Sequence, residues 1–255
     1  MIGNTCKDHT RAGRGCATNH TPGCQGHVYP PASNITLHGA TNTSDYWSKL
    51  GRFRTGGAAR FDGTSTFGVT SHELEFNFTS NPYYEAKGMV GGGVNKSSEF
   101  SIQMVVHPIG PTQGNVQVLA NKPGEWKLSI NAKGVLEWAV SLSGKMVVAT
   151  GSTVLQSQVD GATATGYVVK ATHAGGTVKV FVCELESDFN CQMRSPDGHA
   201  TGSLPLDSGS SDITWGAESG SILSDSGLGT VTNGFDGAIE EAFLYKISLE
   251  NVNAY

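Results

Sequence analysis

The sequence predicts an all-β protein that forms a two-sheet antiparallel sandwich. Glycine is abundant, at 34 of 255 residues, and charged residues make up only 15%. Glycine weakens helix interiors and permits the positive φ angles of tight turns. Short apolar segments recur about every 8–15 residues between glycine or proline turns, as expected for two packed sheets.

The clearest strand pattern is a hairpin with one buried side. Each of its strands has an apolar residue at every second position, and a turn signal at 131–134 separates them. These apolar residues are Trp126, Leu128 and Ile130 in the first strand, and Leu136, Trp138 and Val140 in the second. Further strand-like segments are at 100–106, 116–120, 145–149, 167–171, 178–182, 213–216 and 238–245.

The sequence divides into two parts. Residues 1–45 hold three of the five cysteines and four of the eight histidines but no periodic apolar pattern, so we expect an irregular Cys/His-rich N-terminal arm. Residues 46–255 carry the strand pattern and are expected to form one β-sandwich domain.

Charge and hydropathy exclude several classes of protein. The net charge of -5 gives no electrostatic footprint for nucleic acid, and no apolar run is long enough for a transmembrane helix. The beginning of the chain has no signal-peptide pattern, so we expect a mature form or a fragment. Asn-X-Ser/Thr sequons indicate a secreted glycoprotein, although chance matches remain an alternative. The five sequons are at Asn19, Asn34, Asn42, Asn77 and Asn95.

The order of the strand motifs resembles the laminin-G-like and pentraxin-like domains of the concanavalin A-like lectin/glucanase superfamily. The opening motif at 59–63 reads A-R-F-D-G, and the closing motif at 235–245 reads F-D-G-A-I-E-E-A-F-L-Y. Motifs between them that resemble the family are at 100–104, 118–122, 134–136, 167–172, 178–182 and 213–217. The resemblance covers residues 55–255 and implies a jelly roll.

This resemblance also implies a structural Ca²⁺ ion. Many members of the family hold one with a few carboxylates and backbone carbonyls. Asp62 and Asp236 are the acidic residues in the opening and closing motifs, and Asp45 lies nearby in the sequence. Ordinary turn aspartates are the alternative interpretation.

Glycan-cleaving relatives need a pair of catalytic carboxylates across the scissile bond. Glu73 and Glu75 lie two residues apart on a strand-like segment, but Asn77 occupies the third alternate position, where jelly-roll glucanases have a carboxylate. Glu240 and Glu241 are adjacent and point to opposite faces. We therefore expect the chain not to be an enzyme.

Cysteine spacing leaves two interpretations of the arm. Cys6, Cys16 and Cys24 each precede a histidine by three or four positions, a spacing that could bring thiolate and imidazole to one zinc ion. A disulfide within the arm is the favoured interpretation, because cysteines usually pair in an oxidising compartment. We expect Cys183 and Cys191 to form a local disulfide. An odd cysteine count leaves room for an intermolecular bond and for self-association through the arm.

Exposed aromatic residues are the natural platform for a sugar. Trp126, Trp138 and Trp215 belong to strand patterns and are expected in the core. Trp47, Tyr83 and Tyr84 lie in loop-like stretches and are the better ligand-binding candidates.

Three functional hypotheses follow. The first is a secreted, non-catalytic glycan-binding or cell-adhesion module whose partner is a glycan or glycoprotein. The alternatives are a structural subunit of an extracellular filament or matrix, and a glycan-cleaving enzyme.

Overall fold

The computed structural model describes residues 5–7, 34–38, 59–70, 99–157, 166–185, 193, 195–207, 211–222 and 229–245. These residues form sixteen strands and no helix, so no described helix could span a membrane. The strands are β1 (Thr5–Lys7), β2 (Asn34–His38), β3 (Ala59–Asp62), β4 (Phe67–Thr70), β5 (Phe100–Pro108), β6 (Gln117–Lys122), β7 (Trp126–Ile130), β8 (Val135–Leu142), β9 (Lys145–Val154), β10 (Tyr167–Ala174), β11 (Thr177–Glu184), β12 (Gly198–Thr201), β13 (Ile213–Trp215), β14 (Ser219–Ile222), β15 (Gly229–Thr232) and β16 (Asp236–Tyr245).

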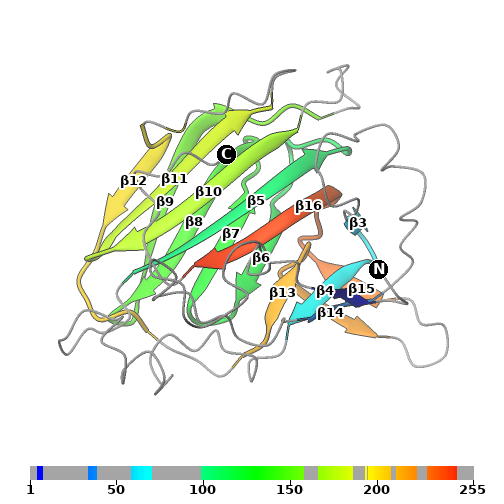
Figure 1. Cartoon of the computed structure of the whole chain (residues 1–255), viewed down its shortest axis with the longest axis horizontal. Coiled ribbons are helices and arrows are strands. Elements are labelled where there is room, and N and C mark those ends of the chain that lie inside the picture. The colour runs from blue at the N-terminus through cyan, green and yellow to red at the C-terminus, as the bar shows by residue number, and fades with distance from the viewer. Residues whose placement is uncertain are drawn as a thin grey trace, which may run out of the picture.

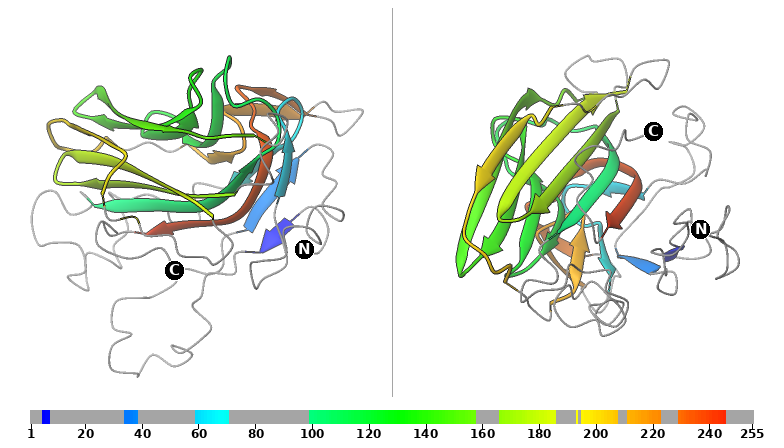
Figure 2. Two further views of the ribbon diagram at one scale, coloured as in Figure 1. Left: turned by 90° about the horizontal axis from the view of Figure 1, so that it is seen from above. Right: turned by 60° about the vertical axis from the view of Figure 1, so that its left-hand side comes forward.

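Two antiparallel sheets make up the sandwich (Figure 1). The eight-stranded sheet has the order β1-β2-β4-β13-β6-β7-β8-β9, and the six-stranded sheet has the order β12-β11-β10-β5-β16-β3. Figure 2 shows the two sheets as facing layers, with β5, β10 and β16 on one side and β6 to β9 on the other. The expected all-β, antiparallel architecture is confirmed.

The core lies between the sheets because each strand turns alternate apolar residues inward. Trp126 and Trp138 from the predicted hairpin are fully buried there, and β5 and β10 supply the facing residues. Trp215 is 4% exposed and its Nε1 donates a hydrogen bond to Thr70 Oγ1 at 2.8 Å. The prediction that these three tryptophans are core residues is confirmed.

The N-terminal arm is more regular than its sequence indicates. Asn34–His38 forms β2, which pairs with β4 and extends the eight-stranded sheet, and Leu37 joins the core. The prediction of a wholly irregular arm is therefore wrong at these residues. Only two alternating apolar residues, Ile35 and Leu37, indicate a strand here. The strand therefore depends on its pairing with β4 more than on its local sequence. The boundary at residue 45 stays a prediction.

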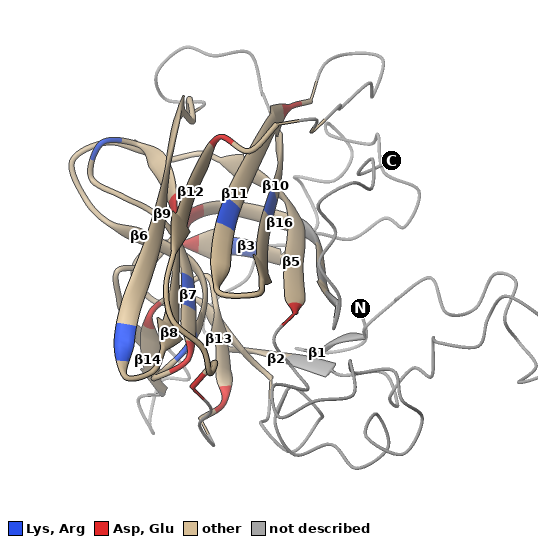
Figure 3. Ribbon diagram, turned by 90° about the vertical axis from the view of Figure 1, so that its left-hand side faces the viewer, with Lys and Arg blue, Asp and Glu red and all other residues tan. Residues whose placement is uncertain are grey.

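Charge is distributed thinly over the sandwich. Figure 3 shows residues of both signs scattered along the described strands, without a continuous patch of either sign. On this side of the described strands, the charged residues are therefore not gathered on one face.

Candidate functional site

Asp62 organises the turn between β3 and β4. Its Oδ1 accepts hydrogen bonds from the backbone N–H groups of Thr64, Ser65 and Thr66 at 2.8, 2.7 and 3.0 Å, and its Oδ2 accepts one from the Ser65 hydroxyl. Gly63 has a φ of 75°, which bends the chain back over the carboxylate. Burial raises the pKa of Asp62, but these hydrogen bonds outweigh it and hold the pKa far below its usual range.

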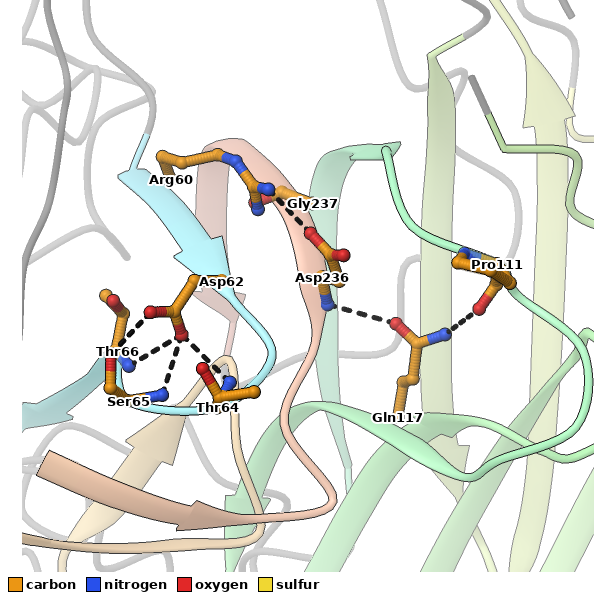
Figure 4. A network of polar contacts seen from close by, with 9 residues as sticks. All are labelled: Arg60, Asp62, Thr64, Ser65, Thr66, Pro111, Gln117, Asp236 and Gly237. Carbon is orange, nitrogen blue, oxygen red and sulfur yellow. Dashed lines mark hydrogen bonds and ion pairs between the residues drawn. The ribbon is translucent and has the colours of Figure 1, made fainter. Parts of the chain in front are cut away.

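Asp236 begins β16 directly beside this turn, in register with Asp62. Arg60 binds it through Nη2 at 2.6 Å from Oδ1, and Arg60 Nη1 donates to the Gly237 carbonyl at 3.1 Å. The backbone N–H of Asp236 donates to Gln117 Oε1 at 3.0 Å (Figure 4). We call Arg60, Asp62, Gln117 and Asp236 the rim network.

The loop that follows β5 closes over Asp236. The backbone N–H groups of Ile109 and Gly110 donate to the Asp236 carbonyl at 3.0 and 3.1 Å. A Cβ on Gly110 would lie 2.1 Å from Asp236 Oδ2, so this close approach requires glycine. Gln117 Nε2 also donates to the Pro111 carbonyl at 2.7 Å, which ties the same loop to the rim network. These contacts connect the β3–β4 turn, the loop after β5 and the start of β16.

The two predicted calcium ligands lie together, and three of their four carboxylate oxygens already contact protein donors. Arg60 forms an ion pair with Asp236, and the Asp62 carboxylate accepts four hydrogen bonds. Within the described residues, no group of three or more His, Cys, Asp and Glu side chains could hold a metal ion. Calcium takes six to eight oxygen ligands, so an ion here would have to displace these protein donors; the predicted structural calcium ion stays a prediction.

This arrangement predicts no stabilisation by calcium. We expect the melting temperature in millimolar CaCl₂ and in EDTA to agree within about 1 °C, since only a ligand that binds the folded state raises it. Differential scanning fluorimetry measures this directly, with MgCl₂ at equal ionic strength as the control. A rise of several degrees with calcium alone would establish the predicted ion instead.

A second polar group adjoins the rim network on the outer side of the eight-stranded sheet. Glu218 pairs with Lys127 at 2.8 Å through Oε1 and accepts from Asn233 Nδ2 at 2.5 Å through Oε2. Asn121 Nδ2 donates to the Glu218 carbonyl at 2.8 Å. The Lys127 hydrogen bond, assisted by Asn233, lowers the pKa of Glu218 against the effect of burial. We call Asn121, Lys127, Glu218 and Asn233 the Glu218 cluster.

The two groups are joined through the backbone. The Val118 N–H, next to Gln117, donates to the Asn233 carbonyl at 2.8 Å. Asn233 is exposed, with a φ of 50°, and lies in the turn between β15 and β16. Sequence reasoning missed this cluster and the roles of Arg60 and Gln117. The Asn-Gly pair at 233–234 was a usable turn signal, but nothing local indicates the partners of Glu218.

The predicted aromatic platform falls outside the described residues, as do most other predicted sites. Cys6 and Asn34 lie on the described strands β1 and β2, but the structure describes only their backbone. Cys183 is disulfide-bonded, and its pairing with Cys191 stays a prediction. Glycosylation, zinc binding and the possible role of Glu73 and Glu75 likewise stay untested. The predicted residues that lie outside the described part are Cys16, Asn19, Cys24, Asn42, Asp45, Trp47, Glu73, Glu75, Asn77, Tyr83, Tyr84, Asn95 and Cys191.

No protein-family model and no curated protein matches this sequence, but solved structures do. A structure described as "Binding domain of Botulinum Neurotoxin DC in complex with SialylT" aligns with a TM-score of 0.50 and 8% identity, over 86% of this chain and 44% of that one. A second, described as "Cell entry of botulinum neurotoxin type C is dependent upon interaction with two ganglioside molecules", aligns with a TM-score of 0.50 and 9% identity over the same shares. The LG1-3 region of the laminin alpha2 chain aligns with a TM-score of 0.42 and 14% identity, over 64% of this chain and 31% of that one.

The two alignments with a TM-score of 0.50 concern the fold alone, because their sequence identity is very low. The chain has the antiparallel jelly-roll sandwich that the resemblance of its strand motifs implies, and this expectation of fold is confirmed. The chain spans less than half the length of each solved chain described above.

Proposed function

We propose that this chain is a secreted, non-catalytic module for glycan binding or cell adhesion, and that its partner is a glycan or a glycoprotein. The observation that supports it most is the fold shared over 86% of the chain with two botulinum neurotoxin structures. One is a binding domain in complex with SialylT, and the other is described by the dependence of toxin cell entry on two ganglioside molecules. Because one fold hosts many functions, the site must supply the rest of the argument.

The described polar groups suit recognition better than chemistry. The Glu218 cluster and the rim network offer amide, carboxylate and cationic groups that are already fixed by hydrogen bonds within the protein. Preorganised polar groups orient a ligand at low entropic cost. In contrast, a glycosidase needs one carboxylic acid with a raised pKa, whereas among the carboxyl groups of the described residues the pKa values of Asp62, Asp197 and Glu218 are lowered.

Sugar stacking needs an exposed aromatic ring, and the three described tryptophans are all buried. We therefore assign the platform to Trp47, Tyr83 and Tyr84, as the sequence predicts. On a glycan array, the wild-type chain should retain a defined set of glycans, and Trp47→Ala should weaken retention about tenfold, the effect of losing one aromatic contact.

Met146→Ser provides the matched control for this experiment. Met146 is 51% exposed on β9, the outermost strand of the eight-stranded sheet, so its loss should leave both stability and glycan retention unchanged. If no glycan is retained by folded wild-type protein, the proposed function is wrong. If Trp47→Ala and Met146→Ser bind equally well, the platform lies elsewhere.

A structural subunit of an extracellular assembly is the second candidate, favoured by one observation. β1 carries Cys6 and is the outermost strand at the other end of the eight-stranded sheet, and such a strand can pair with another chain. Self-association through the arm should appear as a disulfide-linked dimer on non-reducing electrophoresis and as an oligomer in light scattering. Monomer in both measurements removes this candidate.

A further inference from the structure

His173 lies in the middle of the hydrophobic core, where a titratable side chain is unusual. It follows Tyr167, Val169 and Ala171 at alternate positions of β10, so it points between the sheets as they do. Its side chain is 0% exposed. In the six-stranded sheet His173 is paired with Phe100 of β5 on one side and Val178 of β11 on the other.

A chain of aromatic contacts connects this histidine to the opposite sheet. The centroid of Phe100 lies 5.7 Å from that of His173 and 5.5 Å from that of Trp138. Trp138 in turn packs on Trp126 at 5.6 Å. We call Phe100, Trp126, Trp138 and His173 the aromatic cluster; it joins β5 and β10 to β7 and β8 across the interior.

Neither imidazole nitrogen of His173 has a hydrogen-bond partner in the described structure. The neighbouring Trp138 differs, since its Nε1 donates to the Thr172 carbonyl at 3.2 Å. A buried neutral imidazole without partners leaves one donor and one acceptor unsatisfied. An apolar residue would fill this position at lower cost, so the histidine is not explained by packing alone.

No described charged side chain offsets a positive charge at this position. The residues paired with His173, Phe100 and Val178, do not titrate, and neither does Trp138, which contacts Phe100 from the opposite sheet. Lys170 and Lys179 alternate with the inward residues and lie on the outer face of the six-stranded sheet. The buried pair Lys122–Glu125 belongs to the β6–β7 turn, which leads into Trp126 and is already internally neutralised.

We propose that His173 is an acid-sensitive switch that loosens the contact between the two sheets at the aromatic cluster. Protonation places an unpaired charge in the core beside Phe100, the ring that contacts Trp138 of the opposite sheet. The charge gains hydration only when β10 and β5 move away from β7 and β8 or when water enters between them. The sandwich is therefore stable at neutral pH and weakens in mild acid.

The direction and range of this effect follow from linkage. Burial lowers the pKa of His173 from 6.5 to about 4 in the folded protein. The folded state therefore binds the proton less well than the unfolded state, and stability falls as the pH decreases from about 6.5 toward 4. The two pKa values correspond to a rise of about 30-fold in the unfolding constant between pH 8 and pH 5.

Urea unfolding followed by tryptophan fluorescence at pH 8 and pH 5 tests this switch. The unfolding constant of the wild-type protein should rise about 30-fold more than that of His173→Phe, which keeps a ring but cannot be protonated. His199→Asn is the matched control, because His199 is exposed on β12. This variant should retain the full wild-type dependence.

The switch is overturned if His173→Phe and wild type show the same dependence on pH. A second measurement applies if that variant does not fold. NMR titration of the imidazole signals in wild-type protein should show one histidine that stays neutral down to pH 5. Finding that every histidine titrates near 6.5 would equally overturn the proposal.

Discussion

Replacing Lys122 with methionine should destabilise the protein by about 3–5 kcal/mol, because a buried carboxylate then loses its ion-pair partner. The Lys122 and Glu125 side chains are 0% and 1% exposed and form an ion pair across the β6–β7 turn. The turn is also closed by the Glu125 N–H, which donates to the Lys122 carbonyl at 3.0 Å. Urea denaturation at pH 7 measures the loss.

The matched control removes both charges. Lys122→Met combined with Glu125→Leu leaves no unpaired ion and should recover most of the stability lost in the single variant, since apolar pairs often replace buried ion pairs at little cost. If Lys122→Met alone is as stable as wild type, the ion pair does not stabilise the folded protein as its burial indicates. If the double variant is no better than the single one, the loss comes from packing and not from charge.

Asp62→Ala should destabilise the sandwich by about 2–4 kcal/mol, because three backbone N–H groups and one hydroxyl lose a charged acceptor. The pKa of Asp62 is lowered on folding, so its contribution is present above its ordinary pKa of 3.8 and is lost as the pH falls further. Stability measured from pH 7 to pH 2 should show this loss in wild type below the range in which His173 acts.

Asp62→Asn separates charge from geometry in the same turn. Its amide oxygen can still accept from the Thr64, Ser65 and Thr66 N–H groups, so the loss should be about half that of Asp62→Ala. Equal losses for both variants would mean that the charge, and not the acceptor geometry, holds the turn. No loss in either variant contradicts the structural role assigned to Asp62.

Strands could be predicted from sequence where their pattern was local. The hairpin of β7 and β8 was evident from alternation and one glycine turn, and it is observed with the expected inward residues. The order of strands could not be obtained in this way. β13 pairs with β4 and β6, both far from it in sequence, and such non-local pairing leaves no local sequence signal.

The site shows the same limit. Asp62 and Asp236 were expected near each other from the resemblance, and the structure brings them into register. Their partners were not predicted. Arg60 and Asp236 are 176 positions apart in the sequence, and a basic residue on a strand gives no sign of which carboxylate it will meet. His173 continued a visible inward pattern, but its lack of a partner is a property of the folded core alone.

Binding without cleavage is the central claim, and one measurement tests it directly. The folded wild-type chain is titrated calorimetrically with a glycan retained on the array, and the recovered glycan is then analysed by mass spectrometry. We expect saturable binding that Trp47→Ala weakens about tenfold, with the glycan recovered intact. Absence of binding, or recovery of a shortened glycan, would contradict the claim.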